Sequence, residues 1–362
     1  MDTEPVFSTM ERVQVDYWDQ ETDENLVCID VHSETHDVKT FTFVSLDGKF
    51  FRFRAGQYFA FDLPVNRELT SRCYSISSSP LRPNAISVTV KRVPGGAVSN
   101  WMHENLMPNT VVKGFGPLGS FTKSANQTEK YLFLSAGSGI TPMMSMVREL
   151  ADLSATAEVT FVHAARSPQD FIFRDELAIL ATKLKSLRLI LIPEEISNEK
   201  SWPGFVGRIS QELLSLTVPD ISQRLVMCCG PGPFMSAARD ITARMGVPGS
   251  RYIEESFQDT IPLPVIDPVQ EVMAETGYRV EFIKQTRTID VACDQTVLAA
   301  AKKSGIKIPS SCSNGLCGTC KSKLISGSVS MNHNGGIRQR EIDAGMFLPC
   351  CSTPLSDLVV DR

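Results

Sequence analysis

Four cysteines near the C-terminal end of the chain constrain its possible folds more than any other feature. Cys312, Cys317 and Cys320 have the spacing C-x4-C-x2-C, and Cys350 follows after 29 further residues. The two irons of a [2Fe–2S] cluster need four thiolates, and this spacing is typical of such a site. A structural zinc site usually has paired C-x2-C knuckles, whereas this chain has one triplet and one distant cysteine. The spacing therefore predicts a [2Fe–2S] site with these four ligands.

The residues around these cysteines resemble the cluster-binding segment of plant-type ferredoxins. Gly315 and Gly318 stand inside the triplet, where glycine supplies the permissive backbone angles that a loop wrapped round a cluster requires. The run Phe347-Leu-Pro-Cys-Cys resembles the ferredoxin segment in which Leu-x-Cys carries the fourth ligand. The resemblance implies that Cys350, rather than its neighbour Cys351, binds the cluster.

Length and charge exclude several classes of protein. The chain has 362 residues, which is enough for two or three domains. Its net charge is −5 and its pI is 5.7, so no overall basic field draws it to nucleic acid or to anionic lipid. No run approaches the ~18 consecutive apolar residues of a membrane helix, and the acidic N-terminus is unlike a secretory signal. We therefore expect a cytoplasmic protein with no nucleic-acid or membrane partner.

The N-terminal third of the chain has a β pattern. Residues 1–25 are polar and acidic, and we expect them to form a loose arm. In residues 26–125, short alternating runs are separated by turn residues, which predicts strands, for example at 40–44, 58–63 and 86–91. Short strands at this regular spacing indicate a barrel or a sandwich.

In residues 126–257 strands alternate with helices. The apolar runs predict strands at 131–135, 158–162, 187–192 and 225–229 and helices at 142–150, 174–184 and 234–245. Such alternation indicates a parallel sheet with helical crossovers. Residues 258–276 contain three prolines and little periodicity, so we expect a semi-rigid linker before the cysteine-bearing unit at 277–362.

One run in the β segment points to a flavin. Arg72-Cys73-Tyr74-Ser75 resembles the Arg-x-Tyr-Ser motif of the ferredoxin–NADP reductase superfamily. A guanidinium can neutralise a flavin phosphate in a fixed geometry, and a tyrosine offers a flat face to the isoalloxazine ring. The resemblance implies these roles for Arg72 and Tyr74 and brings the hydroxyl of Ser75 to flavin N5. The four residues alone are equally compatible with a buried barrel tyrosine and a surface arginine.

A second run supports the flavin interpretation. Gly95-Gly96-Ala97-Val98-Ser99 resembles the superfamily's Gly-Gly-x-x-Ser phosphate loop, which opens a helix whose N-terminal amides bind phosphate. The resemblance implies cofactor contacts from Gly96, Val98 and Ser99. The loop resembles the FAD-type branch more than the FMN branch, which implies FAD. Lys91, just before the loop, is either a further phosphate contact or a solvated strand lysine.

The α/β segment carries a turn of the same superfamily. The run Ala136-Gly-Ser-Gly-Ile-Thr-Pro142 matches its Gly-x-Gly-x-Thr-Pro turn, with Pro142 where the Rossmann fingerprint has a third glycine. The resemblance implies that Gly137 and Gly139 let the backbone approach a pyrophosphate and that Thr141 touches the nicotinamide ribose. A Gly-x-Gly alone is also compatible with an ordinary strand–helix turn.

Two later runs resemble the superfamily's hydride-transfer site. Cys229-Gly-Pro-Gly-Pro-Phe-Met235 resembles its Cys-Gly-Pro-x-x-Phe-Met turn, which implies that Cys229, not Cys228, lies near hydride transfer, with Gly230 at the nucleotide. Glu255-Ser256-Phe257 resembles its terminal Glu-x-Phe, which implies that Phe257 covers the flavin. The alternatives are a small buried cysteine and a phenylalanine of the core.

The choice between NADH and NADPH depends on the residues after the second strand. Arg166 stands there, where a basic residue can bind the 2′-phosphate of NADPH and an acidic one favours NADH. An arginine at this place also occurs in NADH-linked members of the superfamily. We therefore expect Arg166 to contact the dinucleotide and favour NADH, with NADPH left open.

The order of the three segments resembles the reductase components of Rieske-type oxygenases, especially those serving glycine betaine, carnitine and related amines. The resemblance implies an antiparallel β-barrel flavin domain, a parallel α/β nucleotide domain and an α+β β-grasp ferredoxin domain. It also implies transfer from NAD(P)H through FAD to a [2Fe–2S] cluster and then to a partner oxygenase. Two alternatives remain, namely an NADH oxidoreductase for hybrid-cluster protein and a redox-sensing module that only holds a cluster.

The ferredoxin-like unit is basic within an acidic chain. Residues 277–362 contain eleven Lys or Arg against seven Asp or Glu, and Lys321 and Lys323 directly follow the cysteine triplet. These lysines are either a solvated surface or a docking face for an acidic patch of the electron acceptor.

Overall fold

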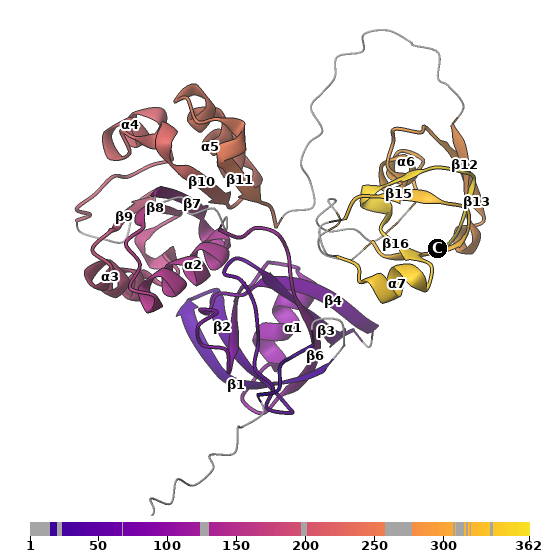
Figure 1. Cartoon of the computed structure of the whole chain (residues 1–362), viewed down its shortest axis with the longest axis horizontal. Helices are drawn as coiled ribbons and strands as arrows, with labels where there is room; N and C mark the ends of the chain where they lie inside the picture. Colours follow the sequence, from indigo (N-terminus) through magenta and orange to yellow (C-terminus); the bar gives the residue numbers. More distant parts are fainter. Residues whose placement is uncertain are drawn as a thin grey trace, which may run out of the picture.

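The computed structural model contains three units arranged in chain order (Figure 1). It describes residues 15–19, 24–66, 68–123, 130–196, 201–257, 277–306, 308, 315, 318, 320–333 and 336–362. The barrel-like unit lies at the bottom of Figure 1, with the parallel-sheet unit above it on one side and the C-terminal unit on the other. This architecture confirms the predicted fold class.

The first unit is a six-stranded antiparallel sheet in the order β4-β3-β6-β1-β2-β5. An additional bridge between Ile76 and Val88 brings the end of β4 to β5, so the sheet closes on itself. Its core is aromatic and includes Phe41, Phe59 and Phe61. The elements are β1 (Glu24–Thr35), β2 (Val38–Ser45), β3 (Tyr58–Val65), β4 (Glu68–Ser75), β5 (Ile86–Lys91), α1 (Ala97–Asn105) and β6 (Val111–Leu118).

This barrel uses residues from the segment that we expected to be a loose arm. Trp18 is buried, and its ring lies 5.2 Å from that of Phe51 and 5.4 Å from that of Phe59. The backbone amide of Trp18 also donates to the carbonyl of Phe50. The hydrophobic core therefore begins earlier than residue 26, while residues 1–14 of the expected arm lie outside the described residues.

The second unit is a five-stranded parallel sheet in the order β11-β10-β7-β8-β9. Apolar clusters on its two faces join it to α2 and α3 on one side and to α4 and α5 on the other. The strand order reverses between β7 and β10, and this reversal is where ligands bind in open α/β sheets. The elements are β7 (Lys130–Ala136), α2 (Ile140–Asp152), β8 (Glu158–Ala165), α3 (Arg174–Lys183), β9 (Leu187–Pro193), α4 (Gln211–Thr217), β10 (Leu225–Cys229), α5 (Gly232–Arg244) and β11 (Tyr252–Glu255).

The third unit is a mixed sheet in the order β13-β12-β18-β14-β16, with β12 and β18 parallel and α6 packed in its core. This is the expected β-grasp arrangement. The elements are β12 (Tyr278–Phe282), β13 (Arg287–Val291), α6 (Val297–Lys303), β14 (Ser322–Ser326), β15 (Val329–Met331), α7 (Gln339–Asp343), β16 (Met346–Phe347), β17 (Ser352–Pro354) and β18 (Leu358–Asp361). The expected linker, residues 258–276, lies outside the described residues.

Hydrogen bonds hold the first two units together along α2. Ser145 donates its hydroxyl to the carbonyl of Ser78 at 2.6 Å, and Arg148 donates to the carbonyl of Ser77 at 2.6 Å. Both acceptors follow β4, the strand with the predicted flavin motif. The α2 helix therefore fixes the parallel sheet relative to that strand. Of the helices in the described residues, none is long and apolar enough to span a membrane.

Candidate functional site

Two turns meet at the carboxyl edge of the parallel sheet. Gly139 follows β7, and a side chain there would place its Cβ 2.2 Å from the carbonyl oxygen of Cys229 at the end of β10. Only glycine fits this close approach of two backbones. Gly230, the residue after Cys229, is also close to Ala136, because a Cβ at Gly230 would lie 3.2 Å from the Cβ of Ala136. The structure thus brings the predicted residues Gly139, Cys229 and Gly230 together.

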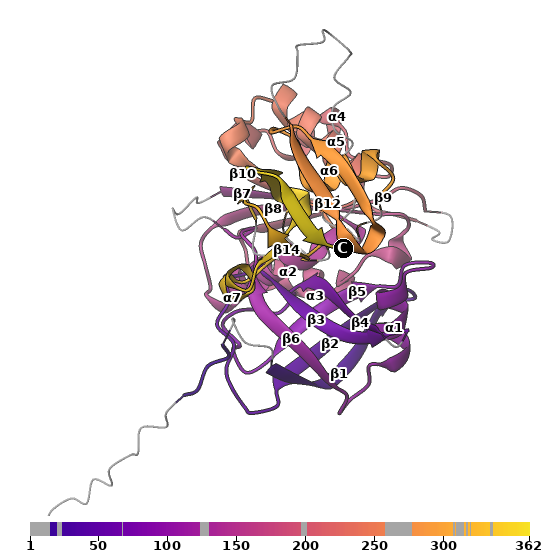
Figure 2. The same cartoon turned by 90° about the vertical axis from the view of Figure 1, so that its right-hand side faces the viewer.

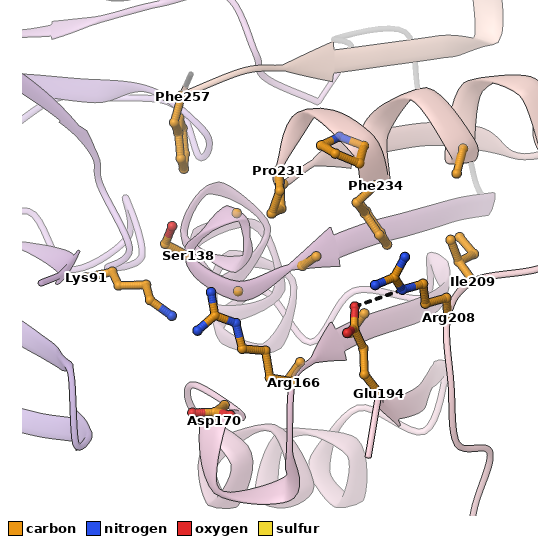
Figure 3. A pocket seen from close by; sticks show the side chains of 18 of the residues that line it. Lys91, Ser138, Arg166, Asp170, Glu194, Arg208, Ile209, Pro231, Phe234 and Phe257 are labelled. Carbon is orange, nitrogen blue, oxygen red and sulfur yellow. Dashed lines mark ion pairs between the residues drawn. The ribbon is translucent and has the colours of Figure 1, made fainter. Parts of the chain in front are cut away.

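A cavity of about 680 Å³ opens beside these turns (Figure 3). Gly137, Ser138 and Gly139 form part of its wall, and Phe257, which is 41% exposed, closes one end. The hydroxyl of Thr141 is buried and donates to the carbonyl of Ser138 at 3.1 Å, so Thr141 holds the turn in shape. A cavity of this size fits a dinucleotide segment, and the glycine turn before α2 is suited to a pyrophosphate.

Charged side chains occupy the opposite wall of the cavity. Arg166 extends from the end of β8 toward Ser138, with Lys91 of the barrel beyond it (Figure 3). Lys91 also forms an ion pair with Asp37 at 3.1 Å. Lys91 therefore lines this cavity.

The far end of the cavity carries an acidic group. Glu194 directly follows β9 and pairs with Arg208 at 3.3 Å (Figure 3). Its backbone amide donates to the carbonyl of Ala165, which keeps it beside the end of β8 and beside Arg166. No sequence signal marked Glu194, because the dinucleotide-binding pattern places its acidic residue after the second strand of the sheet, whereas Glu194 follows the third.

A buried polar cluster lies between the barrel and the parallel sheet. Ser75 at the end of β4 is buried, and its hydroxyl lies 3.4 Å from a carboxyl oxygen of Glu255 at the end of β11. Glu255 is paired in register with Cys229 of β10, so Ser75, Glu255 and Cys229 gather at one point. Cys229 is fully buried.

Burial governs the protonation of this cluster. It raises the pKa of Glu255 to about 8, partly opposed by the hydrogen bond from Ser75. It also raises the pKa of the Cys229 thiol well above its usual value, and the nearby Glu255 adds to the shift. Glu255 Oε1 is buried without a hydrogen-bond partner in the described part of the chain. An orphaned carboxyl oxygen fits a site that a polar ligand completes.

The predicted flavin residues lie on two neighbouring parts of the barrel. Arg72 and Tyr74 stand on β4, where Tyr74 is paired with Phe59 of β3. Tyr74 is half-buried, its ring centroid lies 6.3 Å from that of Phe61, and burial raises the pKa of its hydroxyl.

Gly96 caps the N-terminus of α1, and Val98 and Ser99 are buried in its first turn. The Ser99 hydroxyl accepts from the amide of Val93 at 3.1 Å, which shapes the loop. A Cβ at Gly96 would lie 2.8 Å from the Ser99 hydroxyl and 3.1 Å from the Val93 carbonyl oxygen, so a larger residue would crowd the loop there. The N–H groups at this helix start fit a phosphate of FAD.

The two predicted cluster ligands that are described belong to one buried cluster of the C-terminal unit. Cys320 and Cys350 are both buried, and the amide of Gly315 donates to the sulfur of Cys350 at 3.2 Å. An amide directed at a sulfur fits a thiolate that binds a cluster. Cys351 instead directs its sulfur to the carbonyl of Leu348 at 3.6 Å. The other two predicted ligands, Cys312 and Cys317, lie outside the described residues.

The family models divide the chain as the fold does. Residues 25–122 match an oxidoreductase FAD-binding domain, and residues 133–240 match an oxidoreductase NAD-binding domain. Residues 281–355 match a 2Fe-2S iron–sulfur cluster binding domain. The expected FAD, NAD and [2Fe–2S] cofactors are thereby confirmed at the level of the domains that bind them.

The chain is similar to several characterised proteins over nearly its whole length. It is 41% identical to the glycine betaine monooxygenase reductase subunit of Pseudomonas aeruginosa, over 92% of this chain and 94% of that protein. It is 32% identical to the NADH oxidoreductase HCR of Escherichia coli, over 91% and 95%. The solved structure of phthalate dioxygenase reductase has the same fold, with a TM-score of 0.58 and 22% identity over 94% of this chain and 98% of that one.

Proposed function

The chain belongs to the three-module oxidoreductases of the ferredoxin–NADP reductase superfamily, and from this premise we propose that it supplies electrons from NADH to a Rieske-type oxygenase. The observation that carries the proposal is the meeting of Ser75, Glu255 and Cys229 beside the dinucleotide cavity. A flavin strand and a nucleotide sheet converge there, as hydride transfer between two cofactors requires.

The residues of the chain would position the reactants. The turn at Gly137 and Gly139 and the start of α2 would bind the pyrophosphate, and Phe257 would shield the flavin from water. Ser75 and Cys229 would contact the flavin and the nicotinamide, and Glu255 would hold a proton beside them. FAD would supply the step from a hydride to single electrons, and the cluster would carry one electron at a time.

Most of the remaining site roles are proposed on the same basis. Arg72 would neutralise a flavin phosphate, Tyr74 would stack on the ring, and the start of α1 with Gly96, Val98 and Ser99 would hold the second phosphate. Thr141, Arg166 and Gly230 would line the bound dinucleotide. The four ligands would be Cys312, Cys317, Cys320 and Cys350. We propose module boundaries at 26–125, 126–257 and 277–362, and action in the cytoplasm.

We propose NADH rather than NADPH as the donor because of Glu194. A carboxylate at the adenosine end of the cavity can accept hydrogen bonds from ribose hydroxyls, and it repels a 2′-phosphate. Its ion pair with Arg208 also engages a cation that could otherwise bind that phosphate.

The acceptor is proposed from the relatives. The name of the P. aeruginosa relative points to an oxygenase acting on glycine betaine, so a quaternary amine oxygenase is the first candidate. Hybrid-cluster protein, the alternative acceptor that the family resemblance implied, is the second candidate, and the similarity to the NADH oxidoreductase HCR of E. coli is in keeping with it.

The test compares the two purified acceptors with the same NADH-reduced chain. Reduction of a glycine betaine oxygenase at least tenfold faster than that of hybrid-cluster protein supports the proposal, and the reverse order refutes it. Dye reduction by NADH is the control, because a sensor that only holds a cluster would reduce neither the dye nor an acceptor.

A further inference from the structure

Two cations of the ferredoxin unit lie over one aromatic ring of the barrel. The guanidinium carbon of Arg338 is 4.3 Å from the ring centroid of Phe115 on β6, and the ammonium of Lys321 is 5.9 Å from it. Phe115 is only 6% exposed. A cation over a ring face within about 6 Å is attracted by the ring quadrupole, and more strongly so once it is desolvated. The contact therefore joins the two units specifically.

A partly buried carboxylate holds both cations in place. Glu341 on α7 pairs with Lys321 at 2.6 Å and with the guanidinium of Arg338 at 3.2 Å, and it accepts from the Arg338 amide at 2.9 Å. Burial alone would raise the pKa of Glu341, but these hydrogen bonds outweigh it and lower the pKa to about 2. Because Glu341 stays ionised at neutral pH, the arrangement of the two cations is pre-formed.

This contact lies at the cluster end of the ferredoxin unit. Lys321 directly follows Cys320. Arg338 is two residues from Gly336, whose amide donates to the carbonyl of Gly315 at 2.9 Å. The Gly315 amide in turn donates to the sulfur of Cys350. A change in the contact of Arg338 and Lys321 with Phe115 would therefore alter the structure close to the proposed cluster.

On the barrel side, the contact lies close to the flavin strand. Phe115 of β6 is paired in register with Ala60 of β3, and Ala60 is paired with Cys73 of β4. Neighbouring strands are about 4.8 Å apart, so the backbones of Phe115 and Cys73 are roughly 10 Å apart. Cys73 stands between Arg72 and Tyr74 of the flavin motif. In Figure 2, α7 accordingly lies above the barrel, beside the strands of that sheet.

We propose that Phe115, Arg338 and Lys321 form the docking contact that positions the cluster for electron transfer from the flavin within one chain. The proposal rests on the function proposed above. Each transfer oxidises the flavin by one electron and reduces one ferric iron of the cluster, and NADH supplies the pair. Lys321 thereby serves the internal interface, whereas its place after Cys320 left open either a solvated surface or a docking face for an external acceptor.

The test uses the full-length chain loaded with FAD and cluster. Phe115→Ala removes the ring, Phe115→Leu keeps an apolar side chain without a π face, and Arg338→Gln removes one cation. Lys323→Gln is the matched control, because Lys323 is an exposed lysine of β14, two residues from Lys321. Rapid-mixing absorbance follows flavin reduction and cluster reduction separately, and hydrogen–deuterium exchange follows residues 111–118 and 336–343.

We expect NADH to reduce the flavin at an unchanged rate in all variants. Cluster reduction should slow about tenfold in Phe115→Ala and less in Phe115→Leu and Arg338→Gln, because a desolvated cation–ring contact is worth about one decade in an equilibrium constant. Exchange of both segments should rise in the variants, with or without cofactors, and stay unchanged in Lys323→Gln.

Unchanged exchange and unchanged cluster reduction in Phe115→Ala would overturn the proposal. It would also be overturned if the variants slowed only the transfer to an added acceptor, since the contact would then belong to that partner. If Phe115→Ala no longer binds flavin, the test depends on Phe115→Leu and Arg338→Gln. These two variants must then show both slower cluster reduction and increased hydrogen–deuterium exchange. If NADH reduces no flavin even in the unchanged chain, the proposed function fails, whereas the exchange measurement still decides the docking contact.

Discussion

The hydroxyl of Ser75 at the end of a barrel strand lies 3.4 Å from the buried carboxyl of Glu255 at the end of the nucleotide sheet. These two residues are 180 positions apart in the chain. Their meeting joins a flavin motif to a nucleotide domain through one titratable group. Because the pKa of Glu255 is raised to about 8, that group is protonated at neutral pH. Two of the predictions below depend on this proton.

The rate of flavin reduction by NADH should fall as the pH rises through about 8. Above that pH a buried carboxylate would face the negative charge that a flavin gains with the hydride, and buried charges interact strongly. We expect about a tenfold decrease between pH 7 and pH 9.5. Glu255→Gln, which mimics the protonated form, should remove the inflection, whereas Glu254→Gln next to it should retain it. A wild-type rate that is level across this range would contradict the assignment.

The same proton links folding to pH. The ordinary pKa of the carboxyl is 4.5 and its folded-state pKa is about 8, so between these values the native state holds a proton that the unfolded chain has lost. The free energy of unfolding should therefore decrease as the pH rises from 4.5 to 8, by at most ~5 kcal/mol. Glu255→Gln should melt at a higher temperature than the unchanged chain at pH 8 and close to it at pH 4.5. Calorimetry without added dinucleotide measures this, and equal melting temperatures at pH 8 would refute it.

Glu194→Gln should shift the preference of the chain toward NADPH. The substitution removes the charge that repels a 2′-phosphate and releases Arg208 from its ion pair. We expect the ratio of kcat/KM for NADH to that for NADPH to fall about fivefold, since a charge interaction between partly exposed groups is worth ~1 kcal/mol. Glu195→Gln is the control at the next position. A ratio that moves equally in both variants would show that Glu194 does not select the nucleotide.

Gly139→Ala and Gly137→Ala should differ sharply. The Cβ at residue 139 would lie 2.2 Å from the carbonyl oxygen of Cys229, whereas the Cβ at residue 137 would meet nothing within 4 Å. Gly137 has a φ of +53°, so alanine there should cost only ~1–2 kcal/mol of stability. Gly139→Ala should separate the two turns and lower NADH affinity at least tenfold, by about 1.4 kcal/mol or more. Titration with NADH and thermal melting measure both, and a Gly139→Ala protein that melts and binds NADH like the unchanged chain would argue against the close approach.

Cys350→Ser should lose the cluster and Cys351→Ser should keep it. The Gly315 amide donates to the sulfur of Cys350, while the sulfur of Cys351 is directed at the Leu348 carbonyl. The visible absorbance of the oxidised cluster and the electron paramagnetic resonance of the reduced one measure its content. A Cys351→Ser protein without these signals, next to a Cys350→Ser protein that has them, would reverse the ligand assignment.

Each short motif could be recognised from the sequence because its residues are neighbours in the chain. The runs at Arg72 to Ser75, Gly95 to Ser99 and Gly137 to Thr141 each lie within one strand end, turn or helix start. The residue pattern and spacing therefore predicted the barrel, the parallel sheet and the [2Fe–2S] site, and the family resemblance of these motifs implied the ferredoxin unit, FAD and the dinucleotide. Glu255 was visible in its motif, but its role was not, because its raised pKa comes from burial that a linear pattern does not contain.

The contacts that join the modules depend on how the chain folds in space. Ser75 meets Glu255, Arg338 covers Phe115, and Glu194 reaches the far end of the cavity only after separate segments pack together. Lys321 illustrates the difference. Its charge and its place after Cys320 suggested either a solvated lysine or an outward docking surface, whereas in the fold it contacts Glu341 and Phe115. Neighbouring residues determine local backbone geometry, so the sequence alone predicts it. Desolvation and charge pairing arise between residues that are distant in the chain and near only in the folded protein, so the tertiary structure decides them.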